Sequence, residues 1–478
     1  MNRSQLMALA VAAALGMASS AFAVSDEELK DLREQVRQMK LDYEKRIDAL
    51  ERRLQQAEDA AGRADAAARN ADATASKAET AAHEAAVQAS SRPTGENAFN
   101  PGLSLILNGT YANLSQDPNG FRINGFVPTM GEVGPPQRGF SLGESELAIS
   151  ANIDPYFRGT LLAALSADNS VAVEEGFIQT IGLSESWAQG LTIKAGRFRS
   201  SVGYLNEIHP HAWDFADAPL ASKVFLGGAL ADDGVQFKWI APTELYVDMG
   251  AEIGRGRSFP AGPEGGRNKN GFGLETLFAH AGGDFGASTA WRLGLSHLRT
   301  SPQDRIYEDV DSTGTTVRNT FSGKSRLWVI DAILKWAPNG NSTVTSFKLQ
   351  GEYFQRSEDG NLTYDTGAAS RGTQTGEFAS RQSGWYLQGV YQFVPRWRVG
   401  YRYDRLNSGT TSLGLVDSGA LTAGDFPILA SYGPSRNTLM FDWSLSEFSR
   451  VRMQLARDTP RLGATDNQVV LQYTMSMG

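Results

Sequence analysis

The fold of this chain is decided by two neighbouring stretches, WYLQGVYQF at residues 385–393 and WRVGYRYD at residues 397–404. In both, apolar or aromatic side chains recur at nearly every second position, and the positions between are mostly polar. This period of two is that of a β-strand with one apolar face. Only Val394-Pro395-Arg396 separates the stretches. The sequence therefore predicts a tight β-hairpin here.

The same alternation occurs at residues 235–239 and 347–353. A soluble β-sandwich would alternate as well, so the connections between strands must decide between a sandwich and a membrane barrel. Short turns, such as residues 154–156 and 242–244, exchange with long polar loops, such as 204–232 and 408–435. One tight rim and one elaborate rim are typical of membrane barrels. The sequence predicts an all-β transmembrane barrel of about sixteen antiparallel strands over residues 103–478.

The first 23 residues have the pattern of a signal peptide. A short positive start precedes an apolar run at residues 6–17, and Ala21-Phe22-Ala23 forms a small-x-small cleavage site. The apolar run is shorter than the ~20 residues of a membrane-spanning helix. We therefore expect secretion across the inner membrane of a Gram-negative bacterium.

Residues 24–90 have helical periodicity. Apolar residues recur at three-and-four spacing from Leu29 to Leu54, and alanines continue the same seam from Ala57 to Ala89. This pattern predicts a coiled coil in the periplasm and hence a homo-oligomer, although a flexible Ala-rich linker is the alternative. The seam resembles the helix of the major murein lipoprotein, which implies a trimer that reaches toward peptidoglycan. Residues 91–102, rich in Pro and Gly, are expected to be a linker.

Composition excludes several classes of protein. The chain has no Cys, which removes disulfides and thiolate sites. Its net charge of -8 argues against nucleic-acid binding. It contains no H-E-x-x-H or P-loop motif, and the G-x-S-x-G match at residues 139–143 opens a strand instead of a strand-to-helix elbow. We therefore expect neither an enzyme nor a resident cofactor.

A family resemblance rests on LTIKAGRFRSSVG at residues 191–203 and DDGVQ at residues 232–236. These stretches resemble the segments of phosphate-selective-type porins that flank the loop folded into the pore. The resemblance implies a porin channel. Related chains with a coiled-coil start are described as zinc-regulated or TonB-dependent receptors. This chain departs from that description, because a gated transporter would need a globular plug and a barrel of about 22 strands.

The third outer loop holds the most unusual polar cluster, at residues 206–217. Its candidates for a pore constriction or a zinc site are Glu207, His209, His211, Asp214 and Asp217. Imidazole and carboxylate together suit zinc. The alternative is that these groups hydrogen-bond the loop to the barrel wall, with Trp213 and Phe215 as packing anchors.

Basic residues are expected on the lumen face of several strands. They are Lys194, Lys238, Lys348, Arg398, Arg402 and Arg452. A ladder of such residues would attract anions. The alternative is that they pair with lumen carboxylates such as Glu352 and Asp404.

The sequence as a whole predicts a trimeric porin in the bacterial outer membrane, surrounded by lipid. Small hydrophilic solutes or ions would diffuse through it passively, and the third loop would narrow the lumen. The alternative hypothesis is an outer-membrane receptor or zinc-uptake protein that binds its ligand through the long loops.

Overall fold

The computed structural model describes Glu34, Arg37, Gln38 and residues 101–127, 133–166, 170–181, 183, 188–262 and 270–477. The chain divides into two compact units, Met1–Ala98 and Phe99–Gly478. In the first unit the three described residues are helical, and Arg37 pairs with Glu34 at 3.2 Å. The expected signal peptide lies outside the described residues. So do the expected coiled coil, apart from these three residues, and the expected linker up to residue 100. No helix in the described part has the length and apolar character to cross a bilayer.

The second unit is built from one antiparallel sheet of eighteen strand segments among the described residues. Their bounds are β1 Gly102–Leu114, β2 Gly139–Leu142, β3 Ser145–Asn152, β4 Phe157–Leu165, β5 Val171–Thr180, β6 Leu191–Arg199, β7 Ala231–Ile240, β8 Tyr246–Gly254, β9 Leu274–Phe285, β10 Thr289–Thr300, β11 Arg305–Val310, β12 Thr316–Trp336, β13 Ser346–Tyr364, β14 Gln374–Val394, β15 Trp397–Leu413, β16 Ser435–Ser446, β17 Ser449–Arg461 and β18 Ala464–Met477.

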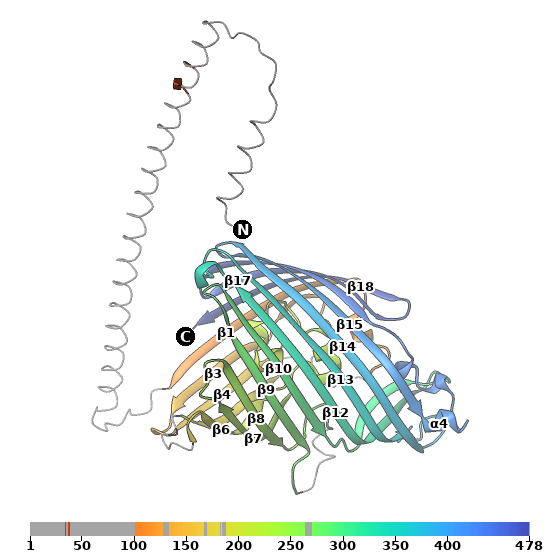
Figure 1. The fold of residues 1–478 in the computed structure, drawn as a ribbon. Coiled ribbons are helices and arrows are strands. Elements are labelled where there is room, and N and C mark those ends of the chain that lie inside the picture. The colour runs from red at the N-terminus through yellow and green to blue at the C-terminus, as the bar shows by residue number, and fades with distance from the viewer. Residues whose placement is uncertain are drawn as a thin grey trace, which may run out of the picture. The chain divides into compact units, whose positions relative to one another are not determined.

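The sheet closes on itself, because β1 pairs with β18 on one side and with β2 and β3 on the other (Figure 1). β2 and β3 follow one another along β1, and β11 continues β10 along β12. The eighteen described segments therefore make a barrel of sixteen staves. This confirms the prediction of an antiparallel barrel of about sixteen strands.

Short helices occupy the connections. Their bounds are η1 Pro118–Gly120, η3 Leu205–Glu207, η4 Pro210–Ala212, α3 Leu220–Leu226, η6 Pro338–Gly340, α4 Gly414–Asp417, η7 Ala423–Asp425 and η8 Pro427–Leu429. All but η6 belong to the long loops, and we call the rim from which these loops leave the strands the loop rim. The opposite rim, with the short turns, is the turn rim.

The strand alternation places apolar residues outside the barrel and polar residues inside. On the β14–β15 hairpin, Trp385 and Tyr401 are exposed, whereas Tyr386 and Arg402 are fully buried. Many large apolar side chains remain exposed on the outer surface of the other staves. A closed sheet with an apolar exterior and a polar interior is the pattern of a barrel that crosses an outer membrane.

The wall of the barrel is uneven in height. Strands β3 to β8 have 8–10 residues each, and we call them the short wall. Strands β12 to β15 have 17–21 residues each, and we call them the tall wall. Nine to eleven residues suffice to span a bilayer. The tall wall therefore continues beyond the bilayer.

The barrel has an apolar core inside it, formed by loops. The third loop, residues 200–230 between β6 and β7, contributes α3 with Leu220 and Phe225, both fully buried. Ile123 and Phe126 of the first loop pack against them, together with inward side chains such as Phe354 on β13. Loop segments therefore occupy part of the space that the sixteen staves enclose.

Candidate functional site

The third loop crosses the interior of the barrel. It leaves β6, the fifth stave, and α3 contacts β13, β14 and β15, the eleventh to thirteenth staves. The backbone N–H of Leu220 donates to the Asp404 carboxylate on β15 at 2.9 Å. Since the thirteenth stave lies half-way round a sixteen-stave barrel from the fifth, the loop joins opposite walls. Gly227 ends α3 with a φ of 69°, a left-handed conformation that favours glycine.

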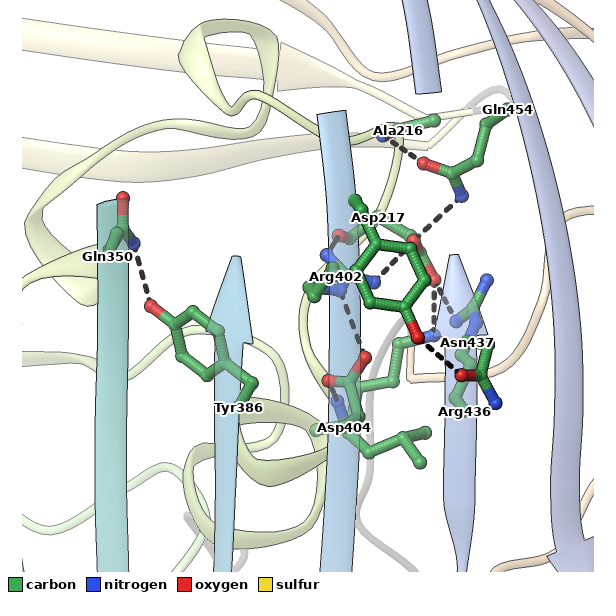
Figure 2. Close-up of polar contacts among 12 residues, drawn as sticks. Ala216, Asp217, Gln350, Tyr386, Arg402, Asp404, Arg436, Asn437 and Gln454 are labelled. Atoms are coloured by element: carbon green, nitrogen blue, oxygen red, sulfur yellow. Dashed lines mark hydrogen bonds and ion pairs between the residues drawn. The ribbon is translucent and has the colours of Figure 1, made fainter. Parts of the chain in front are cut away.

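Asp217 holds the loop to the tall wall and its neighbour β16. Its carboxylate accepts hydrogen bonds from Arg402 at 3.0 Å and from Gln454 at 3.0 Å, and it is also bound by Arg436 (Figure 2). Lys223 of α3 lies 3.1 Å from the same carboxylate. Burial alone would raise the pKa of Asp217, but these cations hold it well below its usual value of 3.8. Asp217 is thus a half-buried anion whose charge is compensated by buried cations.

Asp214 forms a second attachment closer to the turn rim. It accepts from Lys348 on β13 at 2.9 Å and from Arg398 on β15 at 3.0 Å. Arg398 also binds Asp442 on β16, which pairs with Arg452 of β17 at 2.8 Å. Arg452 donates in addition to the backbone carbonyl of Trp213 at 2.8 Å. We call the contacts of Asp214 and Asp217 the Asp end of the loop.

The two predicted packing anchors, Trp213 and Phe215, lie beside these contacts. The Trp213 indole donates to the Ile208 carbonyl at 2.8 Å, and the ring is buried in the apolar core. Phe215 packs with Val390 and Met440, and its ring lies 4.8 Å from the Arg402 guanidinium. Both side chains are placed where they restrain the loop against the wall.

The two histidines contact the short wall instead. The His209 Nε2 lies 2.9 Å from Glu175 on β5, and its Nδ1 lies 3.3 Å from Glu174 and 3.5 Å from Glu146 on β3. His211 Nδ1 lies 3.0 Å from the other oxygen of Glu146. Burial lowers the pKa of His209, but its carboxylate neighbours raise it more, to about 10. We call this cluster the His end of the loop.

A β-bulge builds the His end. On β4, Leu162 pairs with Glu175 and the next residue, Ala163, pairs with Val173, so Glu174 is the extra residue of β5. In a regular strand, adjacent side chains point to opposite faces. The bulge instead brings both carboxylates inside the barrel, where His209 contacts both. Bulges of this kind often re-aim side chains beside functional sites.

The remaining predicted site residues have other direct contacts. Glu207 is exposed and accepts a hydrogen bond from the Ser201 hydroxyl. Lys194 on β6 lies over the Phe177 ring at 4.7 Å, and Lys238 on β7 pairs with Asp248 at 3.2 Å. The structure thus divides the predicted cluster: the two histidines meet glutamates, and the two aspartates meet lysine and arginine.

Sequence reasoning missed three residues of the His end. Glu146 could have been found, because Leu147 and Ile149 alternate with it and put it on the inward face. Glu174 and Glu175 gave no such signal, since one of two adjacent residues in a regular strand should face outward.

No protein-family model matches the chain. An uncharacterized protein of Aquifex aeolicus (strain VF5) is 28% identical over 409 residues, which cover 81% of this chain and 80% of that protein. Three solved outer-membrane structures are similar, each over 79% of this chain. The trimer form of Vibrio cholerae OmpT has a TM-score of 0.47 at 11% identity and 99% coverage of its chain. The channel DcaP of Acinetobacter baumannii has a TM-score of 0.47 at 10% identity, with 97% of its chain covered. The anion-selective porin of Comamonas acidovorans has a TM-score of 0.44 at 11% identity, with 99% of its chain covered.

Proposed function

We propose that the protein is an outer-membrane channel for the passive diffusion of small hydrophilic solutes, with a preference for anions. The apolar exterior and polar interior of the closed barrel support the membrane location. The third loop, anchored to opposite walls, supports a narrowing of the lumen at that level. A solute would pass beside the loop and meet a surface held in place by the Asp end.

One observation carries the preference for anions. Three ion pairs on the lumen wall are asymmetric: their basic members expose about a quarter of the side chain, whereas the acidic members are buried. The pairs, with exposed fractions, are Lys238 (25%) with Asp248 (2%), Lys348 (24%) with Asp214 (9%), and Arg398 (25%) with Asp442 (0%). A solute in the lumen would therefore meet the cations first. Charges that line a narrow channel set its ion preference.

We further propose a homotrimer, in which the predicted periplasmic coiled coil joins three chains and extends toward peptidoglycan. The coiled-coil seam of residues 24–90 supports this assembly. The apolar outer surface of each barrel would contact lipid.

The reversal potential in a KCl gradient across a planar bilayer tests the channel and its preference. The wild-type protein should conduct and favour chloride. Lys348→Gln should move the reversal potential toward zero, because it removes one exposed positive charge from the lumen. Asp214 keeps Arg398 as a partner in this variant, so its charge stays compensated.

The matched control is Arg326→Gln. Arg326 pairs with Asp359 at 2.9 Å on the outer face of the barrel, so its removal should leave selectivity unchanged. Cation preference in the wild type, or equal effects of both variants, would contradict the proposal. A folded barrel without any conductance would favour the alternative, a receptor that binds its ligand through the loops.

A further inference from the structure

We propose that the His end of the third loop binds a divalent transition-metal ion of the Zn²⁺ class, with Glu146, Glu174 and His209 as ligands. Among the residues that the structure describes, these three form the group of His and acidic side chains whose ligand atoms all lie within 4.8 Å of one another. The inference goes beyond the diffusion channel and is independent of it.

The spacing of the three ligand atoms fits a small ion. His209 Nδ1 lies 3.3 Å from the Glu174 oxygen and 3.5 Å from the Glu146 oxygen. Around a tetrahedral zinc ion with bonds of about 2.0–2.2 Å, neighbouring ligand atoms are roughly 3.3–3.6 Å apart. The Glu146 and Glu174 oxygens lie within 4.8 Å of each other, so an ion could enter once these two side chains draw together around it. A fourth position would remain for water or a solute.

Two buried atoms at this point have no hydrogen-bond partner. They are Oε2 of Glu146, whose side chain is only 1% exposed, and Nδ1 of His209. Buried polar atoms are nearly always satisfied. The two atoms face each other, but their geometry makes no hydrogen bond. A cation between them would satisfy both at once.

The surrounding residues orient the ligands as in known metal sites. His209 Nε2 contacts the Glu175 carboxylate at 2.9 Å, which leaves Nδ1 to face the ion. A carboxylate on the second ring nitrogen is the usual support for a metal-bound histidine. His211 contacts Oε1 of Glu146 at 3.0 Å and thereby directs Oε2 toward the site. The β-bulge at Glu174 supplies the third ligand.

The charges at the His end also favour a cation. Three carboxylates, Glu146, Glu174 and Glu175, gather around His209 here. The opposing positive charges are the His209 imidazolium, whose proton a metal ion would displace, and Arg199, which donates to Oε2 of Glu174 at 2.9 Å. That oxygen retains a second lone pair for a metal ion. Imidazole nitrogen among carboxylate oxygens suits zinc and its neighbours better than Ca²⁺ or Mg²⁺, which prefer oxygen alone.

Calorimetric titration with ZnCl₂ tests the site. The full chain should be used in detergent micelles, with an affinity tag that contains no histidine. The wild type should show a single saturable site. His209→Ala and Glu146→Gln should abolish binding, and Glu175→Gln, which removes only the supporting carboxylate, should weaken it roughly 10–100-fold. His297→Ala is the control, because that ring packs against Trp328 in a tilted arrangement, away from the loop, and zinc affinity should not change.

A second measurement needs no variant and therefore does not depend on the folding of a mutant. X-ray absorption of the zinc-loaded wild type should show nitrogen and oxygen ligands at about 2.0–2.2 Å with one imidazole. Absence of saturable binding, equal binding by wild type and His209→Ala, or a spectrum with no imidazole or two would each overturn the proposed ligand set. None of these readouts depends on conductance, so the two proposals can fail separately.

Discussion

The two ends of the third loop contact the barrel through opposite chemistry. At the Asp end, Asp217 has three cationic partners and Asp214 has two. At the His end, three carboxylates face Arg199 and two imidazoles, and atoms of Glu146 and His209 remain without a hydrogen bond. The same loop thus carries one electrostatically saturated contact and one unsaturated contact.

This difference separates attachment from ligand binding. A saturated buried cluster has no unpaired ligand atom left for a metal ion, and the removal of one member leaves its partners uncompensated. An unsaturated cluster can accept a cation with little change in structure. The comparison therefore assigns attachment of the loop to the Asp end and metal binding to the His end.

The largest expected effect is on stability. Asp217→Asn leaves Arg402, Arg436 and Lys223 without the shared anion, and the loss of one member of a buried ion pair typically costs about 3–5 kcal/mol. We expect a decrease of that size in the free energy of unfolding, measured by denaturant titration in micelles. Asp233→Asn is the matched control, because Asp233 pairs with Arg197 on the more exposed outer face, where about 0–1 kcal/mol is expected. Equal losses of unfolding free energy in Asp217→Asn and Asp233→Asn would contradict the stabilising role of the Asp end.

The next effect concerns zinc. At a free Zn²⁺ concentration one hundred times the dissociation constant, the free energy of unfolding should rise by about 2.7 kcal/mol. Asp217→Asn should show the same increment from its lower baseline, because the ion binds at the other end of the loop. Glu146→Gln should show none. A zinc increment that disappears in Asp217→Asn would mean that the two ends act as one unit.

The smallest expected effect is a flat pH dependence. The folded pKa of Asp217 lies well below its usual value of 3.8, because of Arg436, Lys223 and Arg402. Its stabilising contribution is therefore complete above pH ~4 and is lost only as the pH falls through the folded pKa. The difference in unfolding free energy between wild type and Asp217→Asn should stay constant from pH 8 to 4 and shrink below that. A decline already near pH 6 would show that Asp217 is not held as an anion.

The barrel followed from local patterns in the sequence. Residues 385–404 alternate around a Pro-containing turn, and the structure ends β14 at Val394 and begins β15 at Trp397. The strand number followed from counting connections. Both features depend on neighbours in the chain, which a sequence displays directly.

The partners of the third loop depended on contacts that a sequence does not display. Asp214 binds Lys348 and Arg398, which lie 134 and 184 residues away. The alternative interpretation, in which loop groups bond to the wall, describes this end well. Glu174 faces inward only because the β4–β5 register slips by one residue, and a single chain gives no sign of such a slip. The sequence could therefore predict which residues belong to the loop and the lumen. It could not predict which of these residues contact one another.

The seam between β1 and β18 has a consequence for how the molecule forms. It pairs Asn108 with Thr474 and Leu114 with Gln468, residues more than three hundred positions apart, whereas most other staves pair with their neighbour in the chain. The local hairpins can close early, but this seam must wait for both ends of the sheet. Until they meet, each end presents a row of unpaired backbone N–H and C=O groups. In water such an edge promotes aggregation, and in hydrocarbon each unpaired group costs several kcal/mol. Insertion and closure of this barrel are therefore coupled, and the open sheet needs protection until the seam is made.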